Sequence, residues 1–186
     1  MTILVVKSTV LIALNYNQGM RIQTERLILR EVKASDAAFY LDLFKDPGFI
    51  ANINDKGLNN VQQVKHYLEK KVIPEYCVAG MGFFTVIEAS SNKPIGVSSI
   101  LQRKETAYKD IGYAFLPAGR GKGYATEATR HMMYYANNVL KESKIIALTS
   151  PKNTASQRVL EKLHFTYVGL KEIQKEKMDC MYEYNF

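Results

Sequence analysis

The chain has 186 residues, of which 47% are hydrophobic and 23% are charged, so it is long enough for one globular domain with a full core. Its net charge of +7 comes from scattered basic residues, with no basic stripe and no zinc finger, which argues against a nucleic-acid partner. An ordinary solvated surface is the simpler explanation of the charge, and attraction of anionic ligands is the functional one. Cys77 and Cys180 lie far apart in the sequence, and the three histidines lack ligand spacing. We therefore expect no disulfide framework, no metal site and a cytoplasmic location.

The first residues of the chain are apolar enough to raise the question of a membrane span or a signal peptide. Thr2 to Leu14 is mostly apolar but contains Lys7, and it is too short to span a membrane. It also lacks the charged start and the cleavage site of a signal peptide. We predict an N-terminal extension of unknown role at 1–19, followed by one domain at 20–186. We expect no membrane partner, and the chain is expected to be a monomer or a homodimer.

Hydrophobic periodicity predicts the order strand, two helices, three strands, helix, strand, helix, two strands. The expected strands are 21–31, 83–88, 95–102, 107–116, 145–149, 165–173 and 178–185. The expected helices are 36–45, ended by Pro47-Gly48, a second opened by Asn59-Asn60 and closed by Pro74, a third at 123–141, and a fourth starting at Asn153.

This order predicts an α/β (α+β) fold. We expect a mixed, mostly antiparallel sheet of about six to seven strands with helices on both faces. The strands at 107–116 and 145–149 are expected to run parallel, because the helix at 123–141 connects them as a crossover. Their ends are expected to splay apart and admit a ligand.

The most informative segment joins the strand at 107–116 to the following helix and reads Arg120-Gly121-Lys122-Gly123-Tyr124-Ala125-Thr126. Glycines allow the backbone to approach an anion closely, and the amides at a helix start point toward it. Arg120 and Lys122 add two full charges. The turn has no Walker A pattern, and Thr126 replaces the third glycine of the dinucleotide fingerprint. The sequence therefore predicts a phosphate-binding turn of another type.

This turn fits the pattern Q/R-x-x-G-x-G/A, with Arg120, Gly123 and Ala125 at the defined positions. It resembles the acetyl-CoA pyrophosphate loop of the GNAT superfamily of N-acetyltransferases. The string 121–128 resembles the branch that contains the ribosomal-protein N-terminal acetyltransferases. A second segment, Asn153 to Phe165, is similar to the N-x-x-S…L-x-K-x-G-F segment of that branch, with His164 in place of the glycine at the helix C-cap.

The resemblance implies transfer of an acetyl group from acetyl-CoA directly to a primary amine, through a tetrahedral intermediate and without a metal. The acceptor is left open between a protein N-terminus, a polyamine and an amino-bearing drug. The resemblance assigns cofactor binding to Phe115, Leu116, Arg120, Gly121, Lys122, Gly123, Tyr124, Ala125, Thr126 and Asn153.

Four of the assigned residues also have simpler explanations. Phe115 and Leu116 occupy the place of a strand bulge whose backbone binds pantetheine and the thioester carbonyl in this family, and plain core is their alternative role. Asn153 inherits a pantetheine contact, and Ser156 inherits a place near the thioester sulfur. A helix N-cap is the alternative for each of these two residues.

The general acid that many GNAT enzymes use is a tyrosine eight residues after the asparagine, and Glu161 stands at that position here. Ser156 is therefore our expected acid, with Tyr113 and Tyr124 as alternatives. The missing tyrosine also leaves open a protein of another class, a module that binds CoA or acyl-CoA without turnover.

Asp110 is our expected general base. Glu88 and a water molecule are alternatives, and an ordinary surface carboxylate is the competing interpretation of both acidic residues. Glu127 lies in the first turn of the helix at 123–141, where compensation of the helix dipole explains it better than catalysis.

Overall fold

In the computed structural model, residues 3–7, 10–15, 19–76, 80–174 and 177–186 are described. Ten strands of this part form one sheet in the order β1-β2-β3-β4-β5-β6-β7-β8-β10-β9. The strands are β1 (Ile3–Lys7), β2 (Val10–Asn15), β3 (Gly19–Gln23), β4 (Leu27–Glu31), β5 (Gly82–Glu88), β6 (Lys93–Leu101), β7 (Lys109–Phe115), β8 (Lys144–Thr149), β9 (Thr166–Gln174) and β10 (Lys177–Asn185). The helices are α1 (Ala37–Lys45), α2 (Pro47–Asn52), α3 (Val61–Tyr67), α5 (Tyr124–Asn138) and α6 (Thr154–Lys162).

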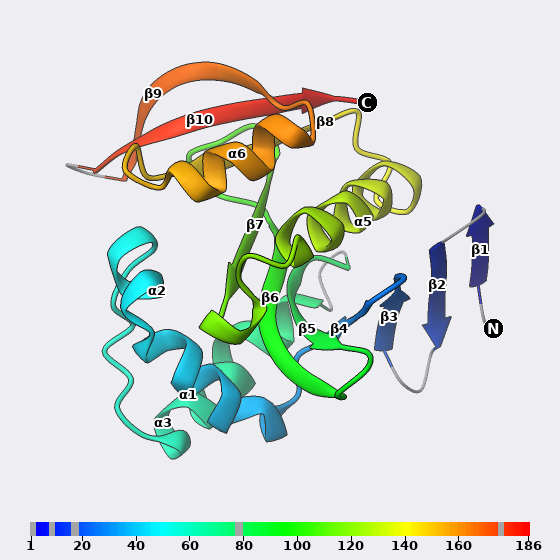
Figure 1. Ribbon diagram of the computed structural model, residues 1–186, viewed down its shortest axis with the longest axis vertical. Helices are drawn as coiled ribbons and strands as arrows, with labels where there is room; N and C mark the ends of the chain where they lie inside the picture. The colour runs from blue at the N-terminus through cyan, green and yellow to red at the C-terminus, as the bar shows by residue number, and fades with distance from the viewer. Residues whose placement is uncertain (1–2, 8–9, 16–18, 77–79, 175–176) are drawn as a thin grey trace.

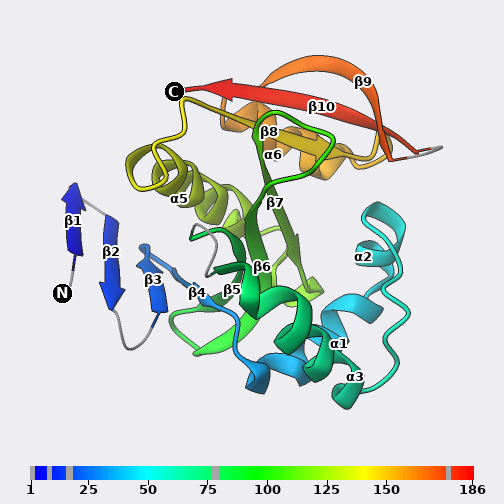
Figure 2. The same cartoon turned by 180° about the vertical axis from the view of Figure 1, so that it is seen from behind.

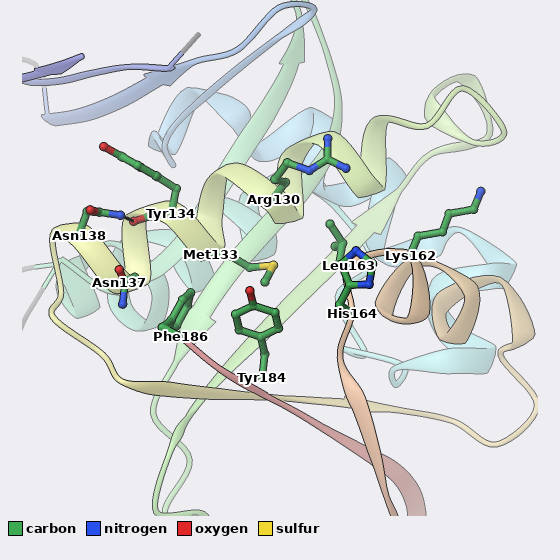
Figure 3. A pocket seen from close by; sticks show the side chains of 10 residues that line it. All are labelled: Arg130, Met133, Tyr134, Asn137, Asn138, Lys162, Leu163, His164, Tyr184 and Phe186. Atoms are coloured by element: carbon green, nitrogen blue, oxygen red, sulfur yellow. Dashed lines mark hydrogen bonds between the residues drawn. The ribbon is translucent and has the colours of Figure 1, made fainter. Parts of the chain in front are cut away.

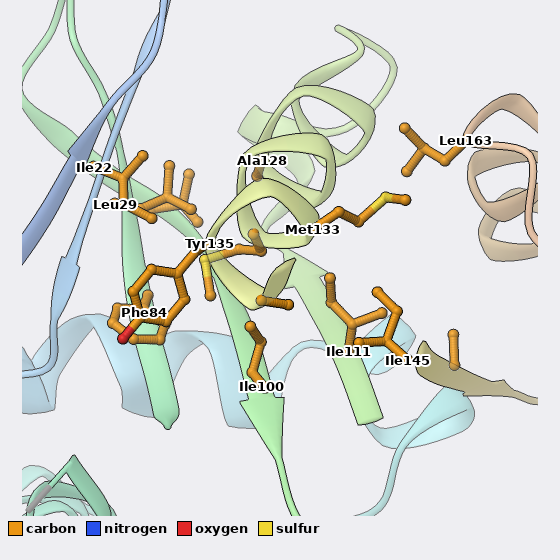
Figure 4. Close-up of a cluster of buried hydrophobic side chains, with 14 of the residues drawn as sticks. Ile22, Leu29, Phe84, Ile100, Ile111, Ala128, Met133, Tyr135, Ile145 and Leu163 are labelled. Carbon is orange, nitrogen blue, oxygen red and sulfur yellow. The ribbon is translucent and has the colours of Figure 1, made fainter. Parts of the chain in front are cut away.

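Helices cover both faces of the sheet, as predicted. Helices α1 to α3 lie on one side of the central strands and α5 on the other (Figures 1 and 2). Each face has its own buried cluster: α5 and α6 pack on the larger one, and α1 to α3 pack on the smaller. In the larger cluster the rings of Phe84 and Tyr135 lie 6.1 Å apart (Figure 4). Cys180 of β10 is buried in the same cluster. Cys77 lies outside the described residues.

The sheet has more strands than the sequence predicted. The strand expected at 21–31 is two strands, because Thr24 starts a tight turn by donating its N–H to the carbonyl of Leu27 at 2.9 Å. In addition, β1 and β2 pair antiparallel with each other, and β2 pairs with β3. Strands β1 and β2 therefore extend the sheet at its edge (Figure 1).

Two prolines have roles that the sequence did not predict. The helix predicted to end before Pro47-Gly48 does end there, because α1 stops at Lys45. Pro47 also begins α2, because Asp46 is the N-cap of α2 and accepts the N–H of Phe49 at 3.0 Å. Pro74 does not close the helix that starts at Val61. After Tyr67 the chain continues as a π-helical turn (Leu68–Val72) and a 3₁₀ turn (Ile73–Glu75). Pro74 is tolerated in the first turn of this 3₁₀ segment, because no backbone N–H is needed there.

The parallel pair β7–β8 confirms the predicted crossover and splay. Only Lys109 with Ile145 and Asp110 with Ile146 are in register. Beyond them β7 stays paired with β6 as far as Phe115, and β8 stays paired with β10 as far as Thr149. The two strands therefore separate toward their carboxyl ends. No helix among the described residues is both long enough and apolar enough to cross a membrane.

Candidate active site

The gap between β7 and β8 opens into a cleft of about 780 Å³. Residues of both strands line it, together with the turn before α5, the first turns of α6 and residues of α2 and of the loop that follows α2. Because α5 and α6 cover one face of the sheet and α2 the other, the cleft has one half on each face.

The turn before α5 has the backbone that an anion site requires. Gly121 and Gly123 have φ angles of 73° and 78°, in the left-handed region that favours glycine. The first hydrogen bond of α5 runs from the N–H of Glu127 to the carbonyl of Gly123 at 3.0 Å. The amides of Tyr124, Ala125 and Thr126 precede that bond, so they belong to the first turn, whose amides have no partner within the helix. These amides and the helix dipole together favour an anion.

The two cations of the turn differ in their surroundings. The sequence suggested that Arg120 presents a free charge to the anion, but its guanidinium already has partners. Its Nε donates to the carbonyl of Phe115 at 2.8 Å, and its Nη2 forms an ion pair with Asp46, the N-cap of α2. Lys122 has a side chain that is 53% exposed, with its Nζ 3.8 Å from Glu88 Oε1. Arg120 thus fixes the turn against α2, and Lys122 is the more available cation.

Glu127 anchors this turn to the β3–β4 hairpin. Its Oε1 accepts the hydroxyl of Thr24 at 2.6 Å and the N–H of Arg26 at 2.9 Å, and its Oε2 accepts Nε of Arg26 at 2.7 Å. Nη1 of Arg26 donates in turn to the carbonyl of Lys122 at 3.0 Å. Burial acts to raise the pKa of Glu127, but these hydrogen bonds outweigh it and lower the pKa. The helix-dipole interpretation missed this role, because the partners lie about a hundred residues away in the sequence.

The alternative acid Tyr124 and the alternative base Glu88 bind each other. The hydroxyl of Tyr124 donates to Oε1 of Glu88 at 2.7 Å, and the guanidinium carbon of Arg26 lies 4.7 Å from the centre of the Tyr124 ring. Glu88 does not line the cleft. Tyr124 lines the cleft, but its hydroxyl proton is held by Glu88, so this pair supports the turn.

The bulge expected at Phe115 and Leu116 is absent from the β6–β7 ladder. Its register is continuous from Leu101–Asp110 to Gly96–Phe115, and Leu116 donates its N–H to Ile95 at 2.9 Å. Leu116 packs against the cluster under α1 to α3 and does not line the cleft.

The same hydrogen bond fixes which backbone groups of β7 face β8. Because residues 116 and 95 are bonded, Phe115 and Gly96 form a non-hydrogen-bonded pair, so the backbone groups of Phe115 point away from β6. By alternation those of Tyr113 do the same. A regular strand edge thus faces the gap where the sequence predicted a bulge.

Ser156 and Tyr113 meet in the half of the cleft under α6. Ser156 Oγ lies 3.0 Å from the hydroxyl of Tyr113, which also donates to the carbonyl of Ser156 at 3.1 Å. Burial raises the pKa of Tyr113 to about 12, so its proton is firmly held. Asn153 accepts the N–H of Ser156 at 3.1 Å, which confirms its alternative role as the N-cap of α6. The sequence named Tyr113 as an alternative acid but did not predict its contact with Ser156.

Asp110 lies in the other half of the cleft. Neighbouring residues of a strand face opposite sides: Tyr113 packs toward α5 and α6, and Ala114 packs toward α1 to α3. Asp110 shares the face of Ala114. It is 3% exposed, so the surface-carboxylate interpretation is wrong, and Nε and Nη2 of Arg103 both lie 2.6 Å from its Oδ2. Burial raises the pKa of Asp110 to about 6, although Arg103 acts to lower it.

A second, smaller hollow of about 310 Å³ lies between α5, the end of α6 and the end of β10 (Figure 3). Met133 and Tyr184 point toward each other across it. His164, at its rim, has a φ angle of 63°. It therefore carries the left-handed conformation for which the resembling segment has glycine. Among the described residues, no group of three or more His, Cys, Asp or Glu is placed to hold a metal ion.

Comparison with known proteins agrees with this geometry. Residues 26–166 match the acetyltransferase (GNAT) domain family. The chain is 28% identical over 157 residues to p20 of Bacillus licheniformis, named as an uncharacterized N-acetyltransferase, covering 83% of this chain and 87% of that protein. It is 26% identical to a solved GNAT-family acetyltransferase from Bacillus anthracis, with a TM-score of 0.72 over 90% of this chain and 98% of the other.

The fold is also that of ribosomal-protein acetyltransferases. RimL, a ribosomal L7/L12 α-N-protein acetyltransferase solved in complex with coenzyme A, superposes with a TM-score of 0.74 at 18% identity, over 88% of this chain and 96% of RimL. Because the family match spans residues 26–166, which include the turn before α5, the splayed strands and α6, the chain belongs to the GNAT family of acetyltransferases.

Proposed function

We propose that this protein transfers an acetyl group from acetyl-CoA to a primary amine, with the cofactor in the α5/α6 half of the cleft. The observation that carries the proposal is that the amides at the start of α5, which have no partner within the helix, lie in the same cleft as the splayed ends of β7 and β8. The amides of residues 121–126 suit a pyrophosphate. The exposed edge of β7 suits the amide groups of pantetheine, which then pair with it as a strand does. RimL, which has the same fold, was solved in complex with coenzyme A, which supports coenzyme A as the ligand.

The acceptor enters from the opposite face, under α1 to α3. There the amine nitrogen attacks the thioester carbonyl carbon, so that a C–N bond forms, the C–S bond breaks and the products are an amide and CoA thiol. The nitrogen loses its proton to Asp110, directly or through water. With a pKa of about 6 this carboxylate is ionised at neutral pH and still basic enough to take part.

The departing sulfur lies on the side of Ser156. In the free protein the one proton of the Tyr113 hydroxyl goes to the carbonyl of Ser156, and Ser156 Oγ lies 3.0 Å from that hydroxyl. In the reaction Ser156 Oγ turns its own proton toward the sulfur, which stabilises the leaving thiolate until it takes up a proton from solvent. The acid and the base therefore act from opposite faces of β7. This arrangement lets cofactor and acceptor bind without competing for space.

The test is a thiol-release assay with acetyl-CoA and a panel of primary amines, with the acetylated product identified by mass spectrometry. We expect thiol release that depends on the amine, and an acceptor heavier by one acetyl group. Tight binding of CoA without amine-dependent release for any amine would instead support the alternative, a CoA-binding module.

A further inference from the structure

The acceptor half of the cleft contains a continuous band of charged side chains. Lys56 comes from the loop after α2, Arg103 from the β6–β7 connection, Asp110 from β7, and Lys177 and Asp179 from β10. All five residues line the cleft. The proposed reaction uses only Asp110, so the other charges need an explanation of their own.

The contacts within the band pair most of these charges. Arg103 places two nitrogen atoms 2.6 Å from one oxygen of Asp110. Lys177 lies 3.8 Å from Asp179 and donates to the carbonyl of Ile53 at 3.2 Å. Asp179 is 6% exposed and is close enough to Asp110 to raise its pKa. The band is thus a network of two ion pairs, Arg103 with Asp110 and Lys177 with Asp179.

Lys56 is the cation that the network does not balance. It forms no ion pair with a carboxylate of the described residues, and its Nζ lies 5.9 Å from the centre of the Tyr67 ring. Lys56 and Arg103 line the same cleft, and burial and then the charge of Arg103 lower the pKa of Lys56. Three cations face two carboxylates in this band, which leaves a surplus of one positive charge.

The rest of this half of the cleft is apolar. Phe44 and Phe49 line its wall, and Ile53 is 40% exposed beside them. A bound molecule here meets an apolar surface, a base and one unbalanced cation. A single surplus charge matches one carboxylate better than a phosphate, which carries nearly two charges at neutral pH.

We infer that the acceptor is an amino acid or a peptide in which the acetylated amine and a carboxylate lie on one apolar body, and that Lys56, beside Arg103, binds that carboxylate. This inference rests on the proposed function. A charge-assisted hydrogen bond of this kind contributes about 1.5–3 kcal/mol, or roughly tenfold to a hundredfold in affinity. Lys56 would therefore set specificity and take no part in bond making.

The experiment compares acids with matched amides. In the first arm phenylalanine, a free amino acid, is paired with phenylalaninamide. In the second arm, which represents an acidic peptide N-terminus, alanyl-glutamic acid with an amidated C-terminus is paired with alanyl-glutamine with an amidated C-terminus, so that the two differ only in the side-chain carboxylate. For each pair the acid-to-amide ratio of kcat/KM is measured in the parent, in Lys56→Met and in Lys65→Met. Lys65 is an exposed lysine of α3 that does not line the cleft. Using the change in the ratio removes the difference in amine basicity within a pair.

We expect Lys56→Met to lower the ratio roughly tenfold to a hundredfold in at least one arm, and Lys65→Met to leave it as in the parent. A ratio that is the same in the parent and Lys56→Met in both arms would overturn the inference while leaving the proposed function intact. A parent that binds CoA and acetylates no amine of the panel would overturn the proposed function, and the inference with it. Melting curves of both variants show that a changed ratio does not come from unfolding.

Discussion

The two halves of the cleft bind charge in different ways. On the α5/α6 face, the anion site consists of backbone amides from one continuous segment, residues 121–126. On the α1–α3 face, the charges are side chains from several separate segments, with Lys56 and Lys177 more than a hundred residues apart. Recognition by backbone requires glycines at fixed positions and leaves a local sequence pattern. Recognition by assembled side chains leaves none, so the first half is readable from sequence and the second is not.

The largest effect is expected on the acceptor face, from Asp110→Asn. Removing the base should lower kcat/KM by roughly a hundredfold to ten-thousandfold. Because burial raises the pKa of Asp110 to about 6, the activity of the parent should rise with pH through about 6 and be lost below it, where the carboxyl is protonated. A pH profile of kcat/KM measures this. Asp42→Asn, an exposed aspartate of α1, is the matched control.

An Asp110→Asn variant that keeps the parent rate and pH profile would assign the proton transfer to water or to another group. The difference between the two halves would then concern acceptor binding alone.

On the cofactor face, Ser156→Ala should lower kcat by roughly tenfold to a thousandfold with little change in CoA affinity, because its hydrogen bond to sulfur strengthens as the thiolate leaves. Thr154→Ala removes an exposed hydroxyl from the same turn of α6, outside the cleft, and should have no such effect. Steady-state kinetics and a melting curve are measured together. A change in melting temperature with kcat intact would show that Ser156 only packs against Tyr113.

Glu127→Gln tests whether the hairpin supports the cofactor half. The neutral amide cannot accept all the hydrogen bonds from Thr24 and Arg26, so the free energy of unfolding should fall by about 2 kcal/mol. For a chain of this size that corresponds to a drop in Tm of roughly 4–8 °C. Glu161→Gln, at an exposed position of α6, is the control. Equal melting temperatures for the two variants would contradict the anchoring role.

The smallest effect is expected at His164, which does not line the cleft. Its positive φ of 63° costs a residue with a side chain about 1 kcal/mol, so His164→Gly should raise the unfolding free energy by up to about that amount. His164→Ala keeps the Cβ atom and should bring no gain. If the alanine variant is stabilised as much as the glycine variant, the side chain and not the backbone is the source of strain.

The predictions from sequence succeeded where the signal is local. Periodicity found α5 and the strands on either side of it, and the crossover rule gave the parallel β7–β8 pair. The prediction failed where distant groups decide. Arg120 pairs with Asp46, 74 residues earlier, and so presents no free charge, and Glu127 has partners in a hairpin a hundred residues earlier. Lys56 sits in a loop without any pattern, and only the fold brings it to the cleft.

Titration of acetyl-CoA into the parent, Gly123→Val and Gly57→Val tests the placement of the cofactor most directly. Both glycines have positive φ angles, 78° and 64°, so both substitutions strain the backbone in the same way, but Gly57 does not line the cleft. The account predicts that Gly123→Val weakens binding at least about tenfold, because the side chain and the altered turn keep the pyrophosphate from the amides, and that Gly57→Val binds as the parent does. A folded Gly123→Val protein with the CoA affinity of the parent would show that the cofactor does not bind at this turn.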